Sequence, residues 1–81
     1  MTAQIVIIAD RVRNIVADVT SQPHDRVIET AHLVRDLELD SLDMVELAMA
    51  LEEAFGIDLE DANLESVPTV GALIAVIEAR T

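Results

Sequence analysis

An 81-residue chain can form one small domain around a single hydrophobic core. Its formal charge is −11, from 16 acidic residues and five basic ones, and every basic residue is an arginine. This balance argues against nucleic acid or an anionic membrane as the main partner and favours basic protein surfaces. The sequence contains no cysteine, which excludes disulfides and thiolate chemistry, so any reactive thiol has to come from outside the chain.

The sequence lacks the usual signals of export and membrane insertion. The apolar run at residues 5–9 is far shorter than a membrane span, and the N-terminus has no basic flank of the kind found in signal peptides. We therefore expect a cytoplasmic protein that is monomeric and does not insert into membranes.

Residues 3–19 are predicted to form the first helix. At about 100° per residue, one group of apolar side chains falls in an arc about 120° wide. This core stripe consists of Ile5, Ile8, Ala9, Val12, Ile15, Val16 and Val19. Val6 and Ile7 lie outside the stripe, and the polar residues and proline at 20–23 end the helix.

Residues 20–40 are predicted to form a long connection, and connections of this length in compact domains are usually functional. Five apolar residues along it are expected to anchor the connection where it runs across the helices: Val27, Ala31, Leu33, Val34 and Leu37. A short helical turn is expected at residues 31–33.

The second helix is predicted at residues 41–55, with Asp40 as N-cap, Asp43 in the capping-box position and Gly56 as the residue that ends it. One apolar stripe faces the core: Met44, Leu47, Leu51, Ala54 and Phe55. A second apolar set, Leu42, Val45 and Met49, is bordered by Glu46, Glu52 and Glu53. This second set either packs under the long connection or forms a docking face, in which carboxylates set the orientation of the partner.

The last third of the chain is predicted to contain a short helix and a long one. Asp61 is expected to cap a short helix of about one and a half turns that ends at Ser66. Three apolar residues are expected to face inward or to line the neighbouring surface: Leu59, Leu64 and Val67. Thr69 is expected to cap the final helix, whose buried stripe is Val70, Leu73, Ile74 and Ile77. The predicted fold is all-α: a small four-helix bundle, with three main helices and a short third helix, in a single domain at residues 1–81.

Ser41 lies at the start of the second predicted helix, within a run of carboxylates. A helix N-terminus has unpaired N–H groups and the positive end of the helix dipole, so a hydroxyl there is well placed to carry a phosphoryl group. Alternatively, Asp40 and Ser41 serve only as capping residues. The residues around the serine have to distinguish these two interpretations.

With these residues assembled, the chain resembles the acyl carrier protein family. The resemblance runs without insertion or deletion through Val27, Ala31, Leu33, Val34, Asp36, Leu37, Asp40, Ser41, Leu42, Asp43, Val45, Glu46, Leu47, Met49, Leu51, Glu52, Glu53, Phe55, Leu59, Asp61, Thr69 and Val70. It implies that Ser41 receives 4′-phosphopantetheine from coenzyme A through a phosphodiester, made by a separate holo-acyl-carrier synthase. Asp40, Leu42 and Asp43 complete the attachment motif.

The resemblance further implies a carrier and not an enzyme. The thiol of the cofactor would hold acyl groups as thioesters, and Ser41 would be an attachment point with no base or orienting group beside it. Its partners would be the synthase and the acyl-transferring and chain-modifying enzymes of fatty-acid or specialised lipid and polyketide biosynthesis, which would dock through basic patches.

Two sets of residues are predicted to serve this carrier function. The partner surface is expected to consist of Leu42, Val45, Glu46, Met49, Glu52, Glu53 and Asp61. The pocket for the acyl chain is expected to be lined by Leu47, Leu51, Phe55, Leu64, Val67, Leu73 and Ile77.

Departures from the family pattern leave the pathway open. Glu38 stands where glycine is usual, Arg35 stands where an acid is common, the last helix has no tyrosine, and the chain has no lysine. A specialised carrier is therefore as consistent with the sequence as a housekeeping fatty-acid carrier.

Two other classes of protein remain as alternatives. A weak calcium binder is suggested by the acidic run at residues 36–43, but an EF-hand loop begun at Asp36 would need glycine at Ser41 and glutamate at Leu47. No metal site is therefore predicted, and His24 and His32 are interpreted as ordinary polar loop residues. An acidic helical adaptor would use the same docking face and leave Ser41 unmodified.

Overall fold

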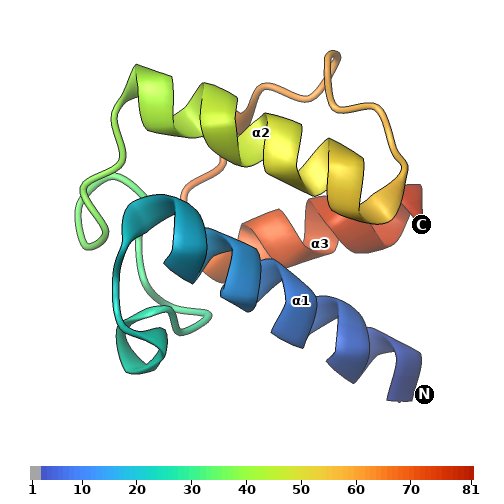
Figure 1. Cartoon of the computed structure of the whole chain (residues 1–81), viewed down its shortest axis with the longest axis horizontal. Coiled ribbons are helices and arrows are strands. Elements are labelled where there is room, and N and C mark those ends of the chain that lie inside the picture. Colours follow the sequence, from blue (N-terminus) through green and yellow to red (C-terminus); the bar gives the residue numbers. More distant parts are fainter. Residues whose placement is uncertain (1–2) are drawn as a thin grey trace.

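The computed structural model describes residues 3–81, with side chains described from residue 7 onward. Within residues 3–81 the chain forms three α-helices, α1 (Ala3–Thr20), α2 (Ser41–Phe55) and α3 (Val70–Arg80) (Figure 1). Two 3-10 turns lie in the connections: η1 (His24–Arg26) and η2 (Leu64–Ser66). The predicted all-α fold is confirmed, although the expected short third helix is reduced to the single turn η2.

α1 packs against both α2 and α3 and presents its predicted stripe to them. Val12 and Val16 are fully buried, and Ala17 is buried as well although it lies outside the predicted stripe. Ile7 is 57% exposed, in agreement with its position outside the stripe. The side chains of Ile5 and Val6 lie outside the part of the chain whose side chains are described.

The connection between α1 and α2, residues 21–40, lies at the left of Figure 1, beside the start of α2. Its buried anchors are Val27, Ala31, Leu33, Leu37 and Leu39. Two predictions here were wrong. Val34 is 48% exposed instead of buried, and the helical turn lies at η1 instead of residues 31–33.

Residues 31–33 cannot form a helical turn because their backbone pairs with the segment that leads into α3. The Leu33 N–H donates to the Pro68 carbonyl at 2.9 Å, and the Val70 N–H donates to the Ala31 carbonyl at 3.1 Å. His32 and Thr69 form an antiparallel bridge between them. These bonds hold the middle of the first connection in an extended conformation against the beginning of α3.

α2 begins and ends at the predicted residues. Asp40 Oδ1 accepts from the Asp43 N–H at 2.9 Å, and Asp43 Oδ2 accepts from the Asp40 N–H at 3.1 Å, which is the predicted capping box. Gly56 follows in the left-handed conformation, with φ of 65°, where glycine carries no steric cost. The helix is therefore fixed at both ends by local interactions.

The core stripe of α2 is shorter than predicted. Met44, Leu47 and Leu51 are buried, but Phe55 is only half-buried and Ala54 is exposed. At this end of the helix, Arg11 of α1 donates to the Ala54 carbonyl at 2.7 Å, and its guanidinium carbon lies 4.4 Å from the centre of the Phe55 ring. A charged side chain thus covers the last turn, because the apolar core ends before it.

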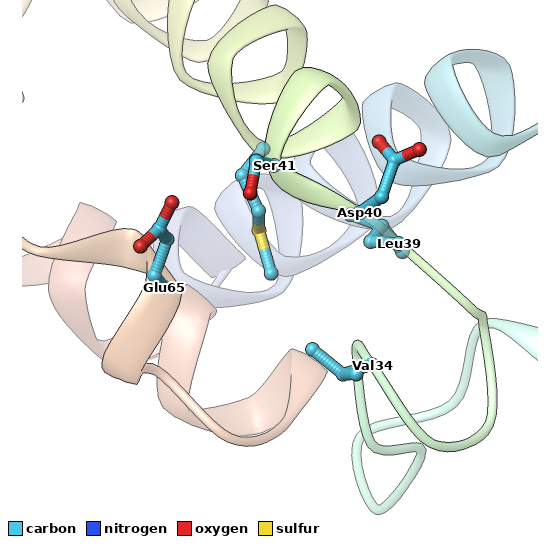
Figure 2. A pocket seen from close by; sticks show the side chains of 6 residues that line it. Val34, Leu39, Asp40, Ser41 and Glu65 are labelled. Carbon is cyan, nitrogen blue, oxygen red and sulfur yellow. The ribbon is translucent and has the colours of Figure 1, made fainter.

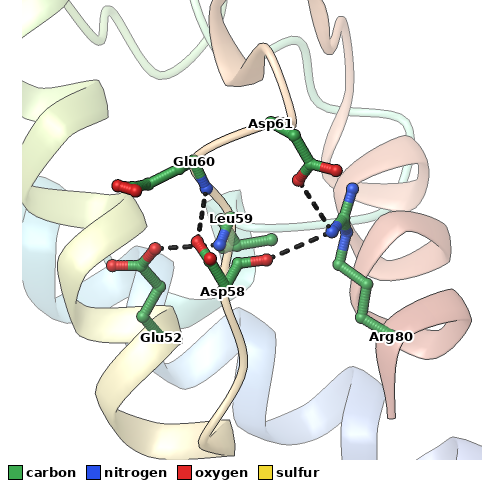
Figure 3. A network of polar contacts seen from close by, with 6 residues as sticks. All are labelled: Glu52, Asp58, Leu59, Glu60, Asp61 and Arg80. Atoms are coloured by element: carbon green, nitrogen blue, oxygen red, sulfur yellow. Dashed lines mark hydrogen bonds and ion pairs between the residues drawn. The ribbon is translucent and has the colours of Figure 1, made fainter.

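The connection between α2 and α3, residues 56–69, differs from the prediction at Asp61. Instead of capping a helix, the Asp61 carboxylate accepts from Arg80 Nη1 at 3.0 Å, and η2 begins three residues later with no side-chain cap (Figure 3). Leu59 and Leu64 are buried as predicted, and Val67 is half-buried. The long-range ion pair has replaced the local cap.

α3 agrees with the prediction. Thr69 Oγ1 accepts from the Ala72 N–H at 3.1 Å as the N-cap, and the predicted stripe of Val70, Leu73, Ile74 and Ile77 is buried. Gly71 permits a close approach, since a Cβ there would lie 3.2 Å from the Glu29 carbonyl. In the described part of the chain, no helix combines the length and the apolar character needed to cross a membrane.

Candidate functional site

Ser41 is the first residue of α2 and lies at the edge of a pocket of about 300 Å³. The pocket is lined by Val34, Leu39, Asp40, Ser41, Met44 and Glu65 (Figure 2). Its walls come from three parts of the chain: the first connection, the start of α2, and η2. Residues that are far apart in the sequence therefore meet around one exposed hydroxyl.

The start of α2 provides two backbone donors beside this hydroxyl. The N–H groups of Ser41 and Leu42 belong to the first turn, where an α-helix supplies no acceptor, whereas the Asp43 N–H is used by the capping box. Among the described residues, none of the side-chain hydrogen bonds involves the Ser41 hydroxyl. A free hydroxyl beside unpaired donors at the positive end of a helix fits a phosphodiester well.

Asp40 and Asp43 have a structural role at this site. Each carboxylate accepts from the other residue's backbone N–H, so both side chains are held by the capping box. In Figure 2 the side chains of Asp40 and Glu65 point to opposite sides of Ser41. The capping box thus fixes the place at which α2 begins and, with it, the position of the Ser41 hydroxyl.

The second apolar set of α2 is exposed and does not pack under the first connection. Leu42 is 66% exposed, Val45 55% and Met49 62%. Glu46 and Glu53 are exposed beside it. This face of α2 therefore presents apolar side chains with carboxylates around them on the surface of the molecule.

The other two acids of the predicted partner surface also stabilise the second connection (Figure 3). Glu52 is half-buried, and its Oε2 accepts from the Leu59 N–H at 2.8 Å. Asp61 is paired with Arg80. These two carboxylates therefore carry contacts within the fold that the sequence analysis did not anticipate.

The residues predicted to line an acyl pocket come together in the core. Leu47, Leu51, Leu73 and Ile77 are fully buried, Leu64 is 6% exposed, and Phe55 and Val67 are half-buried. None of the seven lines the pocket at Ser41, but Leu64 lines a neighbouring pocket of about 210 Å³ that shares Met44 and Glu65 with it. Met44 thus lies between the surface hollow at Ser41 and the segment around η2.

Four residues of the Ser41 pocket were absent from the predicted site: Val34, Leu39, Met44 and Glu65. The alternation of Leu37, Glu38 and Leu39 is the pattern of an extended segment with one buried face, and it could have indicated that Leu39 is buried next to Ser41. The sequence carries no such signal for Val34 or Glu65, since tertiary contacts of the two connections decide their positions.

His32 also has a role that the sequence did not reveal. Its Nδ1 accepts from the Val34 N–H at 3.2 Å and from the Arg35 N–H at 3.1 Å. The ring therefore caps the turn that carries Val34 to the pocket. Across residues 3–81, no three histidine or carboxylate side chains come together as the ligands of a metal ion would.

Comparison with known proteins agrees with this geometry. The family described as "Phosphopantetheine attachment site" matches residues 10–77, which includes Ser41 and all the residues of its pocket. The chain is also 40% identical over 74 residues to "Acyl carrier protein" from Picosynechococcus sp. (strain ATCC 27264 / PCC 7002 / PR-6), with 91% of each chain covered. These matches show that the chain belongs to the acyl carrier protein family, as a non-catalytic carrier with covalently attached 4′-phosphopantetheine.

Proposed function

We propose that Ser41 is the residue that carries the 4′-phosphopantetheine. The observation that supports this most strongly is an exposed hydroxyl, free of hydrogen bonds to the rest of the described chain, at the first residue of α2 and at the edge of a 300 Å³ pocket. The other hydroxyls within residues 10–77 lack this combination of features. Those of Thr20 and Ser66 donate to backbone carbonyls and that of Thr69 caps α3, whereas Ser21 and Thr30 are exposed but lie in the first connection, outside the α-helices. Ser41 is therefore the better acceptor for a transferred group.

The residues around Ser41 would bind and orient the attachment. Its Oγ would form the phosphodiester by attacking the phosphorus of coenzyme A that bears the pantetheine arm; the pyrophosphate linkage would break and adenosine 3′,5′-bisphosphate would leave. The N–H groups of Ser41 and Leu42, with the dipole of α2, would favour the added negative charge. The proton would leave to a base of the synthase, because no basic side chain of this chain lines the pocket. Once attached, the cofactor supplies the thiol that this cysteine-free chain lacks.

The test is modification by coenzyme A and a broad-specificity holo-acyl-carrier synthase, followed by intact mass. The native chain should gain the mass of one phosphopantetheine, and Ser41→Ala should gain none. Ser66→Ala is the matched control, because its hydroxyl lies on η2 near the same pocket but donates to the Asn63 carbonyl. Full modification of Ser41→Ala, or none of the native chain, would contradict the assignment.

The exposed face of α2 is proposed as the surface that the synthase and the acyl-processing enzymes recognise. Leu42, Val45 and Met49 would supply apolar contact, and Glu46 and Glu53 would steer basic partners. Replacing both glutamates by lysine should slow association with the synthase and reduce its salt dependence while the helix content stays nearly unchanged. Asp10→Lys with Asp18→Lys on α1 is the control, since it changes the net charge equally; equal slowing in both would mean that no local surface is involved.

The cargo is proposed to be an acyl chain that enters between α2, α3 and η2. Each methylene left in water forgoes roughly 0.8 kcal/mol of burial free energy, so a medium or long chain is stabilised by entering the predicted apolar lining.

A long acyl load should therefore raise the unfolding temperature above that of the form with cofactor alone, and a two-carbon load should do so much less. Leu51→Trp, which fills the proposed space, should remove this dependence on chain length. Equal unfolding temperatures for both loads in the native chain would favour small or polar cargo.

A further inference from the structure

The turn at residues 32–37 forms part of the pocket beside Ser41. It carries Val34, which lines the pocket, and leads into Leu39, which lines it as well (Figure 2). Within the turn, the N–H groups of Asp36 and Leu37 donate to the His32 carbonyl at 2.9 and 3.1 Å. The geometry of this turn therefore decides where one wall of the pocket lies.

Two further N–H groups of the turn, those of Val34 and Arg35, depend on a single side-chain atom. The N–H groups of Val34 and Arg35 both point at His32 Nδ1, at 3.2 and 3.1 Å. Nδ1 can accept only when it carries no proton, so the ring has to be neutral with its hydrogen on Nε2. Protonation would turn Nδ1 from an acceptor into a donor, and its N–H would then face the N–H groups of Val34 and Arg35 with no acceptor between them.

We infer that His32 is a positioning residue for the Ser41 pocket: its neutral ring holds the turn that places Val34 at the pocket, and protonation of the ring releases that turn. The consequence for modification rests on the proposed attachment at Ser41, whereas the capping of the turn does not. Histidine is the side chain suited to such a response, since it changes charge within the physiological pH range.

The other bonds of His32 explain why release would be local. Its N–H donates to Asp36 Oδ2 at 2.7 Å, and its residue is bridged to Thr69 at the start of α3. Leu33, the next residue, is fully buried and bonded to Pro68. The base of the turn is therefore held by the core and by α3. In its outer part, the Val34 carbonyl accepts from the Glu38 N–H at 3.1 Å, and the N–H groups of Val34 and Arg35 depend on the ring.

The charged groups near the turn do not substitute for this acceptor. Asp36 uses one carboxylate oxygen on the His32 N–H, and Arg26 of η1 reaches the Asp36 carbonyl at 3.5 Å. Arg35 belongs to the turn itself. On the side of α3, His32 faces the uncharged Thr69. Glu29 of the first connection contacts α3 through its carbonyl, which accepts from the Gly71 N–H at 2.9 Å.

Amide spectra of the unmodified protein test the capping directly, because they require neither Ser41 nor a partner. Three variants are compared with the native chain: His32→Asn, which keeps an acceptor that does not titrate; His32→Ala, which has none; and His24→Ala, which changes an exposed histidine on η1. The amide protons of Val34 and Arg35 are followed from about pH 8 to about pH 5, a range that brackets histidine titration.

At the upper pH, the Val34 and Arg35 amide protons should resonate at lower field in the native chain and in His32→Asn than in His32→Ala. On acidification the native signals should move to the positions of His32→Ala, while those of His32→Asn should not move. His24→Ala should follow the native chain. The inference is wrong if the native signals stay with those of His32→Asn down to about pH 5.

The rate of modification tests the consequence for the pocket. The synthase has a pH dependence of its own, so the rate of the native chain is divided by that of His32→Asn at each pH. The ratio should be near one at about pH 8 and fall by at least about two- to tenfold at about pH 5.5, since the loss of even one of the two hydrogen bonds to the ring corresponds to a factor of that size. A constant ratio alongside moving amide signals would show that the turn opens without controlling modification.

Discussion

The two connections of this fold border the same pocket but are held in place by different forces. The first connection, residues 21–40, has five buried side chains, and its backbone pairs with the segment leading into α3. The second connection, residues 56–69, has Leu59 and Leu64 as buried hydrophobic anchors before α3 begins. Its last residues, Pro68 and Thr69, pair with the first connection, but residues 57–63 are otherwise restrained chiefly by polar contacts of the exposed or half-exposed side chains of Arg80 and Glu52 (Figure 3).

This difference indicates which side of the pocket can move. Buried apolar anchors and backbone pairing hold Val34 in place once its turn is formed, whereas exposed ion pairs contribute little to stability. Segments with few buried contacts open at a lower free energy than the rest of a domain. We therefore expect the wall formed by Glu65 and η2 to yield first when a cargo enters.

The largest expected effect comes from removing one anchor of each connection. Leu33→Ala should lower the free energy of unfolding by about 3–4 kcal/mol. Leu33 is fully buried, and the backbone pairing with residues 68–70 keeps its segment from collapsing into the cavity. Leu64→Ala should lower it by only about 2 kcal/mol, because the loosely held second connection can collapse into the space. Urea unfolding followed by circular dichroism measures both.

The order of these two losses is what matters. Both side chains are leucine and both are buried, so the transferred apolar area is similar and the difference reports how far the surroundings relax. If Leu64→Ala costs as much as Leu33→Ala, the second connection is as rigid as the first, and the comparison fails.

A smaller effect is expected from the arginines that reach each connection from a helix. Arg80 Nη1 donates to the Asp58 carbonyl at 3.1 Å and to Asp61 Oδ1 at 3.0 Å, while Arg13 Nε donates to the Val27 carbonyl at 2.7 Å. Arg80→Gln should lower the overall stability by only about 0.5 kcal/mol but should speed amide exchange across residues 57–63. Arg13→Gln should leave exchange near residue 27 almost unchanged, since Val27 is fully buried.

Hydrogen exchange read by NMR distinguishes these outcomes. Asp61→Asn serves as a control that removes the charge of the partner but leaves the contact between Arg80 and the Asp58 carbonyl intact. It should therefore have a weaker effect on residues 57–63 than Arg80→Gln. If Arg13→Gln speeds amide exchange near residue 27 as much as Arg80→Gln speeds it near residue 60, the buried Val27 side chain does not protect the first connection from opening.

The helices could be predicted from the sequence because their signals are local. Apolar periodicity and capping residues a few positions away gave α2 its observed first and last residues and gave α3 its N-cap and buried stripe. The same reasoning failed at Ala54, where the apolar period continues but the core does not. Periodicity shows which face of a helix is apolar but not how far a neighbouring helix extends along it.

The connections and the pocket were less predictable because distant residues determine them. Asp61 has the sequence context of a cap, but Arg80 binds it from 19 positions away. Val34 has the same character as the buried anchors around it, and only the turn capped by His32 turns it outward. The position of Ser41 at the start of α2 could be predicted because the capping box is local. The walls of its pocket could not be predicted, because they come from both connections.

A small stabilising effect is expected at Glu38, in the backbone of the first connection. Its φ is 61°, in the left-handed region, where a residue with a Cβ is strained by about 1–2 kcal/mol and glycine is not. Glycine loses more chain entropy on folding, so Glu38→Gly should raise the free energy of unfolding by only about 0.5–1 kcal/mol. Glu38→Gln keeps the Cβ and removes the charge, so it separates backbone strain from repulsion among the acids at residues 36–43. Urea unfolding should show a higher midpoint for the glycine variant and little change for the glutamine variant. If both variants gain equally, the left-handed residue is not strained, and charge repulsion is what limits the stability of the first connection.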